Sequence, residues 1–202
     1  MRVLMVLLAV SVAFAQECPT IRVQEDFDLE VYASKRWYVQ EQMEVHYLPK
    51  EQNNCVFAEY QQLSKNTFWG FNIQVHNYAY DRQQHKSYDS GSFICAKTTE
   101  VPAKLNVGPC WFPRISGWTT GAYWVLRHDE DAGYAVIIGG QPTNRSAKGC
   151  STNHGVNNSG LWIFTRAQER DQKVVDLARE ATKEFELDLS VLNQVDQTNC
   201  TF

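Results

Sequence analysis

The six cysteines are the residues of this 202-residue chain with the most distinctive chemistry. A cysteine can act as a nucleophile, bind a metal ion or form a disulfide. Neighbouring cysteines are at least 15 residues apart, so no Cys-x-x-Cys pair occurs and a zinc site is disfavoured. Because their number is even, we expect them all to be paired, in a connectivity that the spacing leaves open. They are Cys18, Cys55, Cys95, Cys110, Cys150 and Cys200.

The other reactive side chains are dispersed. None of the five histidines has a second histidine within four residues. The sequence also contains no nucleophile elbow, phosphate loop, dinucleotide-binding motif or zinc-protease motif. His76 alternates with Ile73 and Val75, which favours a histidine on a sheet over a metal ligand. We therefore predict no catalytic residue, no metal site and no cofactor. The histidines are His46, His76, His85, His128 and His154.

The charge and composition narrow the class of protein further. The formal net charge of -4 gives no basic face for nucleic acid. The 6 Trp, 9 Tyr and 10 Phe residues are too many for a disordered chain. Apart from the amino terminus, no apolar run approaches the roughly 20 residues of a transmembrane helix. The sequence therefore predicts a folded domain in which much aromatic surface must be accommodated.

Residues 1–15 have the pattern of a secretory signal peptide. Arg2 is followed by the apolar run 3–14, and Ala13-Phe14-Ala15 fits a small-x-small cleavage site. Secretion agrees with the expected disulfides. The thylakoid lumen is the alternative, but residues 16–23 leave no room for a second targeting segment. Residues 16–202 are then the mature chain, which we expect to be one domain.

Three sequons follow the predicted signal peptide. Asn144 and Asn157 lie in a loop, 141–159, that is rich in Gly and Asn and is expected to be exposed, so we predict that both are glycosylated. The third, Asn199, adjoins Cys200, and we expect the disulfide to hinder its modification.

Alternating hydrophobicity predicts an all-β fold with eight strands. Turn residues at regular spacing separate the segments, which is typical of a sandwich or an up-and-down barrel. Apolar residues recur at helical spacing only over residues 168–186, which predicts one amphipathic helix against the outside of the strands. The expected strands are 36–45, 55–63, 67–80, 88–98, 104–112, 122–127, 134–139 and Leu161–Thr165.

Five blocks of the sequence resemble the lipocalin family, in particular its apolipoprotein D-like and plastid-lipocalin branches. They cover nearly the whole predicted mature chain, in the family's order and spacing. Two features depart from the family pattern: Lys35 stands where a glycine is usual, and the loop between Asp129 and Tyr134 is one residue longer. The blocks are Phe27-Asp28-Leu29-Glu30-Val31-Tyr32 with Arg36-Trp37-Tyr38, Lys104-Leu105-Asn106-Val107 with Cys110-Trp111-Phe112-Pro113, Tyr123-Trp124-Val125-Leu126 with Gly133-Tyr134-Ala135-Val136, Leu161-Trp162-Ile163-Phe164-Thr165-Arg166, and Leu187-Asp188-Leu189 with Asp196-Gln197-Thr198-Asn199-Cys200.

The resemblance implies an eight-stranded antiparallel up-and-down barrel with a C-terminal helix outside. It implies that Trp37 lies at the closed end with Arg166 across its ring, as a structural base. It also implies the disulfides Cys18–Cys150, Cys55–Cys200 and Cys95–Cys110, the last of which would hold the hairpin beside the cavity mouth.

A barrel of this size can hold one small ligand. By resemblance, and by the alternation of side chains along a strand, the predicted ligand-binding residues are Ala58, Tyr60, Trp111, Phe112 and Trp162. The same alternation puts Val39, Glu41 and Met43 on the side of Trp37, so Glu41 is either an acid inside the cavity or a rim residue. No polar group that would anchor a ligand can be assigned.

The function that follows is a secreted carrier of one hydrophobic small molecule: a sterol, retinoid, carotenoid, bilin or fatty acid. Flat aromatic walls suit such ligands. Two alternatives belong to other classes. One is an enzyme on a lipocalin scaffold, an isomerase or an epoxide-modifying protein, and the other is an extracellular module that binds a protein through mouth loops such as 44–53.

Overall fold

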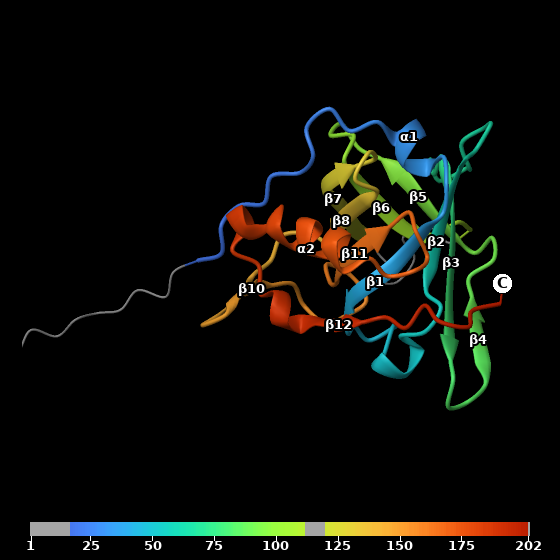
Figure 1. Cartoon of the computed structure of the whole chain (residues 1–202). Helices are drawn as coiled ribbons and strands as arrows, with labels where there is room; N and C mark the ends of the chain where they lie inside the picture. Colours follow the sequence, from blue (N-terminus) through green and yellow to red (C-terminus); the bar gives the residue numbers. More distant parts are fainter. Residues whose placement is uncertain (1–16, 112–119, 202) are drawn as a thin grey trace, which may run out of the picture.

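The computed structural model describes residues 17–111 and 120–201, and its main feature is a closed antiparallel β-barrel (Figure 1). The eight barrel strands follow the order β11-β8-β7-β6-β5-β3-β2-β1, and pairing of β1 with β11 closes the barrel. The predicted fold class is therefore confirmed. The barrel strands are β1 (Trp37–Met43), β2 (Phe57–Gln62), β3 (Ile73–Asp81), β5 (Ile94–Thr98), β6 (Lys104–Pro109), β7 (Gly121–Asp129), β8 (Tyr134–Ile138) and β11 (Leu161–Thr165).

Shorter elements surround the barrel. Helix α2 (Gln172–Glu180) packs outside against β8 and β11, and α1 (Leu29–Ala33) precedes β1 (Figure 1). None of the helices in the described segments is long and apolar enough to cross a membrane. The remaining elements are β4 (Lys86–Asp89) on β3, β12 (Leu192–Gln194) on β1, the hairpin of β9 (Asn144–Ser146) and β10 (Gly149–Ser151), and the 3-10 turns η1 (Lys50–Gln52), η2 (Lys183–Phe185) and η3 (Leu189–Val191).

Several predicted elements are shorter than expected, and the strand predicted at 67–80 begins only at Ile73. The strand predicted at 88–98 is divided into β4 and β5, because the Asp89 carboxylate accepts a hydrogen bond from the Gly91 N–H and Gly91 takes a positive φ of 48°. The strand predicted at 104–112 ends at Pro109. The helix predicted at 168–186 covers only α2, which begins after the N-cap Asp171 and is followed by η2.

A bulge in β1 changes the side of the sheet that the residues after Val39 face. Val39 pairs with Phe164 but Glu41 pairs with Ile163, so the extra residue at Gln40 shifts the alternation. Trp37 and Val39 belong to the inner core, whereas Met43 packs in the outer core beneath α2. The prediction that Glu41 and Met43 share the side of Trp37 is therefore wrong.

Glu41 takes neither of the two places predicted for it. Its side chain lies outside the barrel wall, is buried, and forms ion pairs with Arg170 at 2.6 Å and with Arg179 of α2 at 2.7 Å. A buried carboxylate is tolerated when such partners compensate its charge. Glu41 thus attaches the helix to the barrel rather than facing a ligand.

Two large hydrophobic cores follow from this arrangement, beside a small cluster of Phe71, Cys95 and Cys110. The outer one fills the space between the barrel and α2, where Val175 and Ala178 are fully buried. The inner one lines the barrel itself and contains Trp37, Tyr60 and Phe164. The inner core is where a cavity could form.

Candidate ligand-binding cavity

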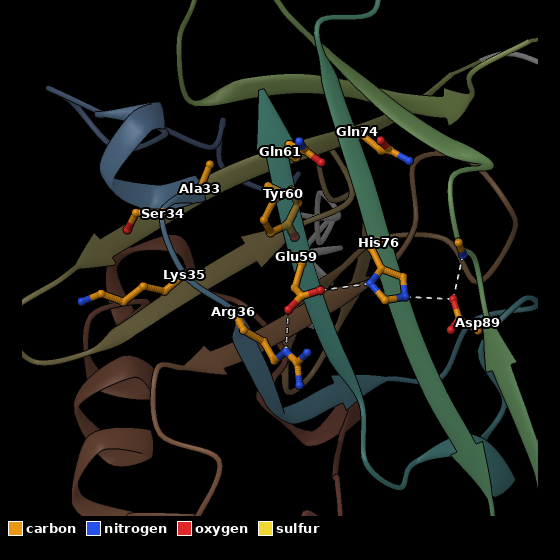
Figure 2. Close-up of a pocket in the computed structure, with 11 residues that line it drawn as sticks. Ala33, Ser34, Lys35, Arg36, Glu59, Tyr60, Gln61, Gln74, His76 and Asp89 are labelled. Atoms are coloured by element: carbon orange, nitrogen blue, oxygen red, sulfur yellow. Dashed lines mark hydrogen bonds and ion pairs between the residues drawn. The ribbon is translucent and has the colours of Figure 1, made fainter. Parts of the chain in front are cut away.

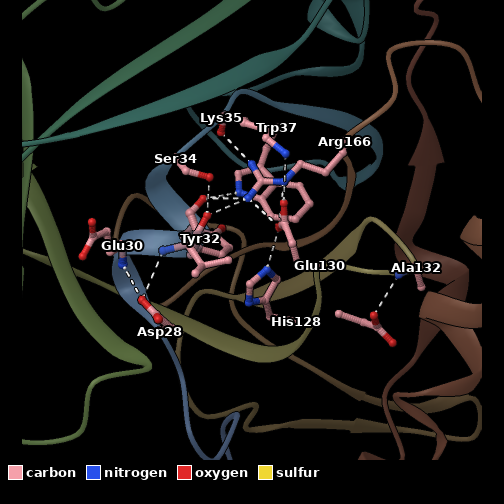
Figure 3. Close-up of polar contacts among 12 residues, drawn as sticks. Asp28, Glu30, Tyr32, Ser34, Lys35, Trp37, His128, Glu130, Ala132 and Arg166 are labelled. Atoms are coloured by element: carbon pink, nitrogen blue, oxygen red, sulfur yellow. Dashed lines mark hydrogen bonds and ion pairs between the residues drawn. The ribbon is translucent and has the colours of Figure 1, made fainter.

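The closed end of the barrel is sealed by Trp37 and Arg166 (Figure 3). The Trp37 ring is fully buried, and its Nε1–H donates to the Tyr32 carbonyl at 2.9 Å. The guanidinium carbon of Arg166 lies 3.5 Å from the centroid of that ring. This geometry permits a cation–π interaction of about 0.5–2 kcal/mol.

Helix α1 supplies the acceptors that hold Arg166 in place. Asp28 caps the helix by accepting from the N–H groups of Glu30 and Val31, as Figure 3 shows. At the C-terminal end of α1, the carbonyls of Val31 and Tyr32 accept hydrogen bonds from the Arg166 guanidinium, at 3.0 Å and 3.1 Å. A cation at a helix C-terminus also interacts favourably with the helix dipole.

Lys35, which replaces the usual glycine, fits this end without strain. It is absent from the residues with positive φ, so the backbone here does not require a glycine. Its carbonyl accepts from Arg166 at 2.6 Å, and its Nζ lies 3.6 Å from Glu130. Lys35 is therefore compatible with the contact between Arg166 and Trp37, and its carbonyl helps to hold Arg166 in place.

Glu130, in the turn between β7 and β8, completes the seal. Its carboxylate accepts from Arg166 at 2.7 Å and lies 3.2 Å from His128. Burial raises the pKa of Glu130, but the hydrogen bonds from Arg166 and His128 outweigh it and hold this pKa below its usual value. The His128 ring packs edge-on against Trp37, with ring centroids 5.6 Å apart.

Above this base the barrel encloses a cavity of about 960 Å³. Three of the predicted ligand-binding residues line it: Ala58, Tyr60 and Trp162. The wall is mostly aliphatic and aromatic. Its apolar members include Val39, Val56, Val75, Ala79, Ile94, Val107, Ala122 and Phe164.

Of the other two predicted lining residues, Trp111 does not lie on the wall. Trp111 is 72% exposed, because β6 ends at Pro109 and the alternation that put Trp111 inside stops there. Its prediction as a lining residue is corrected accordingly. Phe112 lies outside the described residues.

Gly160 fixes the position of Trp162. It has a φ of 105°, and a Cβ at this position would come 2.1 Å from the Trp162 ring. Only a glycine therefore allows the indole to lie against the backbone of the mouth loop. The ring is held on the cavity wall by this packing.

The wall also carries a hydroxyl cluster that sequence reasoning missed. The Tyr123 hydroxyl lies 2.5 Å from that of Tyr32 and 2.7 Å from that of Tyr60. Tyr60 and Tyr123 line the cavity, and Tyr32 packs on Trp37 with ring centroids 5.3 Å apart. Burial raises the pKa of Tyr60 to about 12 and those of Tyr32 and Tyr123 well above their usual value. The hydroxyls therefore remain protonated at neutral pH.

Disulfides hold the segments around the open end. Cys18–Cys150 ties the amino-terminal arm to β10, Cys55–Cys200 ties the start of β2 to the carboxyl-terminal tail, and Cys95–Cys110 joins β5 to the residue after β6. These are the pairs that the resemblance implies, and they leave no free cysteine. The mouth itself is lined by loop residues, among them Tyr47, Leu48, Val156 and Asn157.

A second hollow, of about 510 Å³, lies on the outer face of β2 and β3 (Figure 2). It contains a chain of charged groups in which Glu59 is bonded to Arg36 at 2.8 Å and to His76 at 3.0 Å, and His76 is bonded to Asp89 at 2.8 Å. The two carboxylates meet opposite nitrogens of the His76 ring, so they do not converge on one ion. Within residues 17–111 and 120–201 no cluster of metal-ligating side chains is found.

Comparisons with known proteins agree with the fold. No protein-family model matches the chain. Insecticyanin from Manduca sexta superposes with a TM-score of 0.59 at 18% identity, covering 89% of this chain and 85% of insecticyanin. Lipocalin 12 from rat epididymis gives a TM-score of 0.58 at 14% identity, covering 90% and 92% of the two chains. At such low identity these matches show the fold alone.

The closed barrel, its sealed base and these neighbours define the class of fold: the chain has the lipocalin fold. In sequence it is similar to apolipoprotein D. The rabbit protein (Oryctolagus cuniculus) is 28% identical over 184 residues, which are 91% of this chain and 84% of the rabbit chain. Apolipoprotein D of Cavia porcellus is also 28% identical, with the same coverage.

Proposed function

We propose that this protein is a secreted carrier that binds one small hydrophobic molecule in the barrel cavity. The observation that carries the proposal is the cavity of about 960 Å³ with predominantly apolar walls above a sealed base. Binding sites for small molecules typically have volumes of roughly 300–1,000 Å³ and apolar linings. Sterols, retinoids, carotenoids, bilins and fatty acids are the candidate classes.

Secretion and processing belong to the same proposal. Residues 1–15 would be removed as a signal peptide, leaving residues 16–202 as a single domain outside the cell. The three disulfides favour an oxidising compartment. Asn144 is exposed on β9 and Asn157 is at the cavity mouth, and both would carry glycans. The loss of mass on treatment with an N-glycosidase, compared between wild type, N144Q and N157Q, checks each site.

An enzymatic activity is not part of the proposal. All six cysteines are in disulfides, so a thiol-dependent isomerase would lack its nucleophile. A protein-binding role for the mouth loops is the remaining alternative, but the apolar cavity favours a small molecule.

The test is a tryptophan-quenching titration with a sterol, a retinoid and a fatty acid. In the variant Ala79→Phe, an added ring would occupy the cavity, because Ala79 is a buried lining residue of β3. The matched control is Gln74→Phe, which adds the same ring to the outer hollow beside the same strand. We expect saturable binding to wild type and Gln74→Phe, weakened at least about tenfold in Ala79→Phe. Flat curves for every ligand, or unchanged binding to Ala79→Phe, would contradict the proposal.

A further inference from the structure

The hydroxyl cluster on the cavity wall makes it possible to specify the ligand more closely. We propose that the cavity takes a neutral amphiphile whose buried end carries a hydroxyl or carbonyl oxygen, bonded to the hydroxyls of Tyr60 and Tyr123, and that it discriminates against a carboxylate. This inference rests on the proposed function and deepens it. Three observations support it.

The first observation concerns hydrogen-bonding capacity. The hydroxyls of Tyr32, Tyr123 and Tyr60 form a chain joined by two hydrogen bonds. Each bond uses one hydroxyl hydrogen, so one hydrogen and several lone pairs remain for a further partner. Tyr60 and Tyr123 line the cavity, whereas Tyr32 lies behind them against Trp37. Either hydroxyl of each pair can be the donor, and when both bonds run from Tyr32 towards Tyr60 the free hydrogen is on the Tyr60 hydroxyl, where a ligand in the cavity can accept it.

The second observation concerns charge. Among the described residues that line the cavity, the one charged side chain is Asp89, and its carboxylate already contacts His76. A ligand carboxylate would thus meet no cation on these walls, and burying an uncompensated charge is strongly unfavourable. Raised pKa values keep the tyrosines neutral as well. Neutral hydroxyls can donate to a carbonyl or exchange hydrogen bonds with an alcohol.

Arg166, the cation of the sealed base, does not change this conclusion. Its guanidinium lies over Trp37 and is not a lining residue of the cavity. Its nitrogens already donate to the carbonyls of Val31 and Lys35 and to the Glu130 carboxylate. A carboxylate on the cavity side of the Trp37 ring could not form a direct ion pair with it.

The third observation concerns orientation. The hydroxyl cluster adjoins Trp37 at the closed end, while the apolar side chains of Val107, Ala79 and Trp162 continue the wall. A ligand with its oxygen at the cluster would keep its apolar body against these walls. The arrangement fits a molecule with one polar end and an extended or planar apolar body.

The experiment compares ligands that differ only in the polar end. Retinol and retinoic acid share one body, as do hexadecanol and hexadecanoic acid, and each pair is titrated at pH 7.4 against wild type and Tyr123→Phe. Tyr123 is the central hydroxyl of the cluster, so its loss breaks both hydrogen bonds. Tyr60→Phe is the second variant, and Tyr134→Phe is the control, because Tyr134 lies in the outer core.

We expect wild type and Tyr134→Phe to bind the alcohol at least about tenfold more tightly than the acid. In Tyr123→Phe and Tyr60→Phe, affinity for the alcohol should fall by about three- to tenfold while affinity for the acid stays the same. Equal affinities in wild type, a preference for the acid, or an unchanged preference in both cluster variants would overturn the inference. If neither member of any pair binds, the proposed function fails instead; binding without discrimination removes only this inference.

Discussion

The two ends of the barrel are built in different ways. At the closed end, Trp37 is held by hydrogen-bonded and charged groups, and Arg166 alone donates to four backbone carbonyls and to Glu130. At the open end, the disulfides tie segments together and loop residues such as Tyr47 and Val156 line the mouth. The side chains of the open end do not fill the space between the strands, which leaves the cavity.

This difference indicates that the closed end and the open end have separate roles, one in stability and one in ligand binding. Directional contacts among buried groups specify one geometry, so the closed end is suited to close the sheet and fix its register. Covalent ties hold loops without filling the interior, so the open end is suited to admit a ligand. Changes at the closed end should therefore reduce stability, and changes around the cavity should mainly alter binding.

The largest effect is expected for Trp37→Ala. Removal of a fully buried indole should lower the free energy of unfolding by about 3–5 kcal/mol. Chemical denaturation followed by circular dichroism measures it. Trp69→Ala is the control, because Trp69 is 41% exposed and should change stability far less. Equal losses in the two variants would remove the special role of the closed end.

Arg166→Met should have the next largest effect. It removes the cation over Trp37, together with the hydrogen bonds that Arg166 donates to the carbonyls of α1 and its ion pair with Glu130. We expect a loss of about 2–3 kcal/mol in the same denaturation experiment. Arg22→Gln, at a side chain that is 75% exposed, should stay close to wild type. A neutral result for Arg166→Met would mean that the base is sealed by Trp37 alone.

The double variant Cys95→Ala/Cys110→Ala tests the open end. These cysteines close a short loop with a sequence separation of 15, so the loss of stability should be at most about 3 kcal/mol. Because Phe93 and Val107 line the cavity next to this disulfide, we expect ligand affinity to fall as well. Calorimetry of unfolding and of ligand binding measures the two effects. Loss of stability with unchanged affinity would show that the disulfide does not shape the mouth.

The pH dependence of stability should be the smallest effect and should involve the closed end. The folded state lowers the pKa of Glu130 from its usual value of 4.5, so its contribution is complete above that value. The contribution is lost as the pH falls through the lowered pKa, because the unfolded chain then binds the proton more readily. Glu130→Gln should therefore show a weaker fall in unfolding free energy below about pH 4.5 than wild type. Glu180→Gln, at an exposed site on α2, is the control, and identical curves for both variants would contradict this role.

The sequence predicts the closed end well because its signals are local. Trp37 and Arg166 each lie in a short block that resembles the lipocalin family. On the cavity wall, Ala58 and Tyr60 are two positions apart on β2, so their side chains face the same side of the sheet. The outward turn of Glu41 was missed because one inserted residue in β1 creates the bulge, and a bulge has no signature in the pattern of alternation. Trp111 was misplaced because the strand pattern continues beyond Pro109, where β6 ends.

The hydroxyl cluster could not be predicted in the same way. Tyr32 comes from helix α1, Tyr60 from β2 and Tyr123 from β7, and 91 residues separate the first from the last. Tyr32 and Tyr123 stand in the blocks that resemble the family, but only the closure of the barrel brings their hydroxyls together. The sequence therefore predicts the cavity, and the structure adds the polar group within it.

Native mass spectrometry of the protein purified from its own source tests the central claim most directly. We expect a mass in excess of the glycosylated, disulfide-bonded chain that corresponds to one bound small molecule. This excess should disappear on denaturation, and the extracted compound should rebind to wild type but at least about tenfold less well to Ala79→Phe. A protein that carries no extractable molecule and takes up none from the sterol, retinoid and fatty-acid panel would contradict the account.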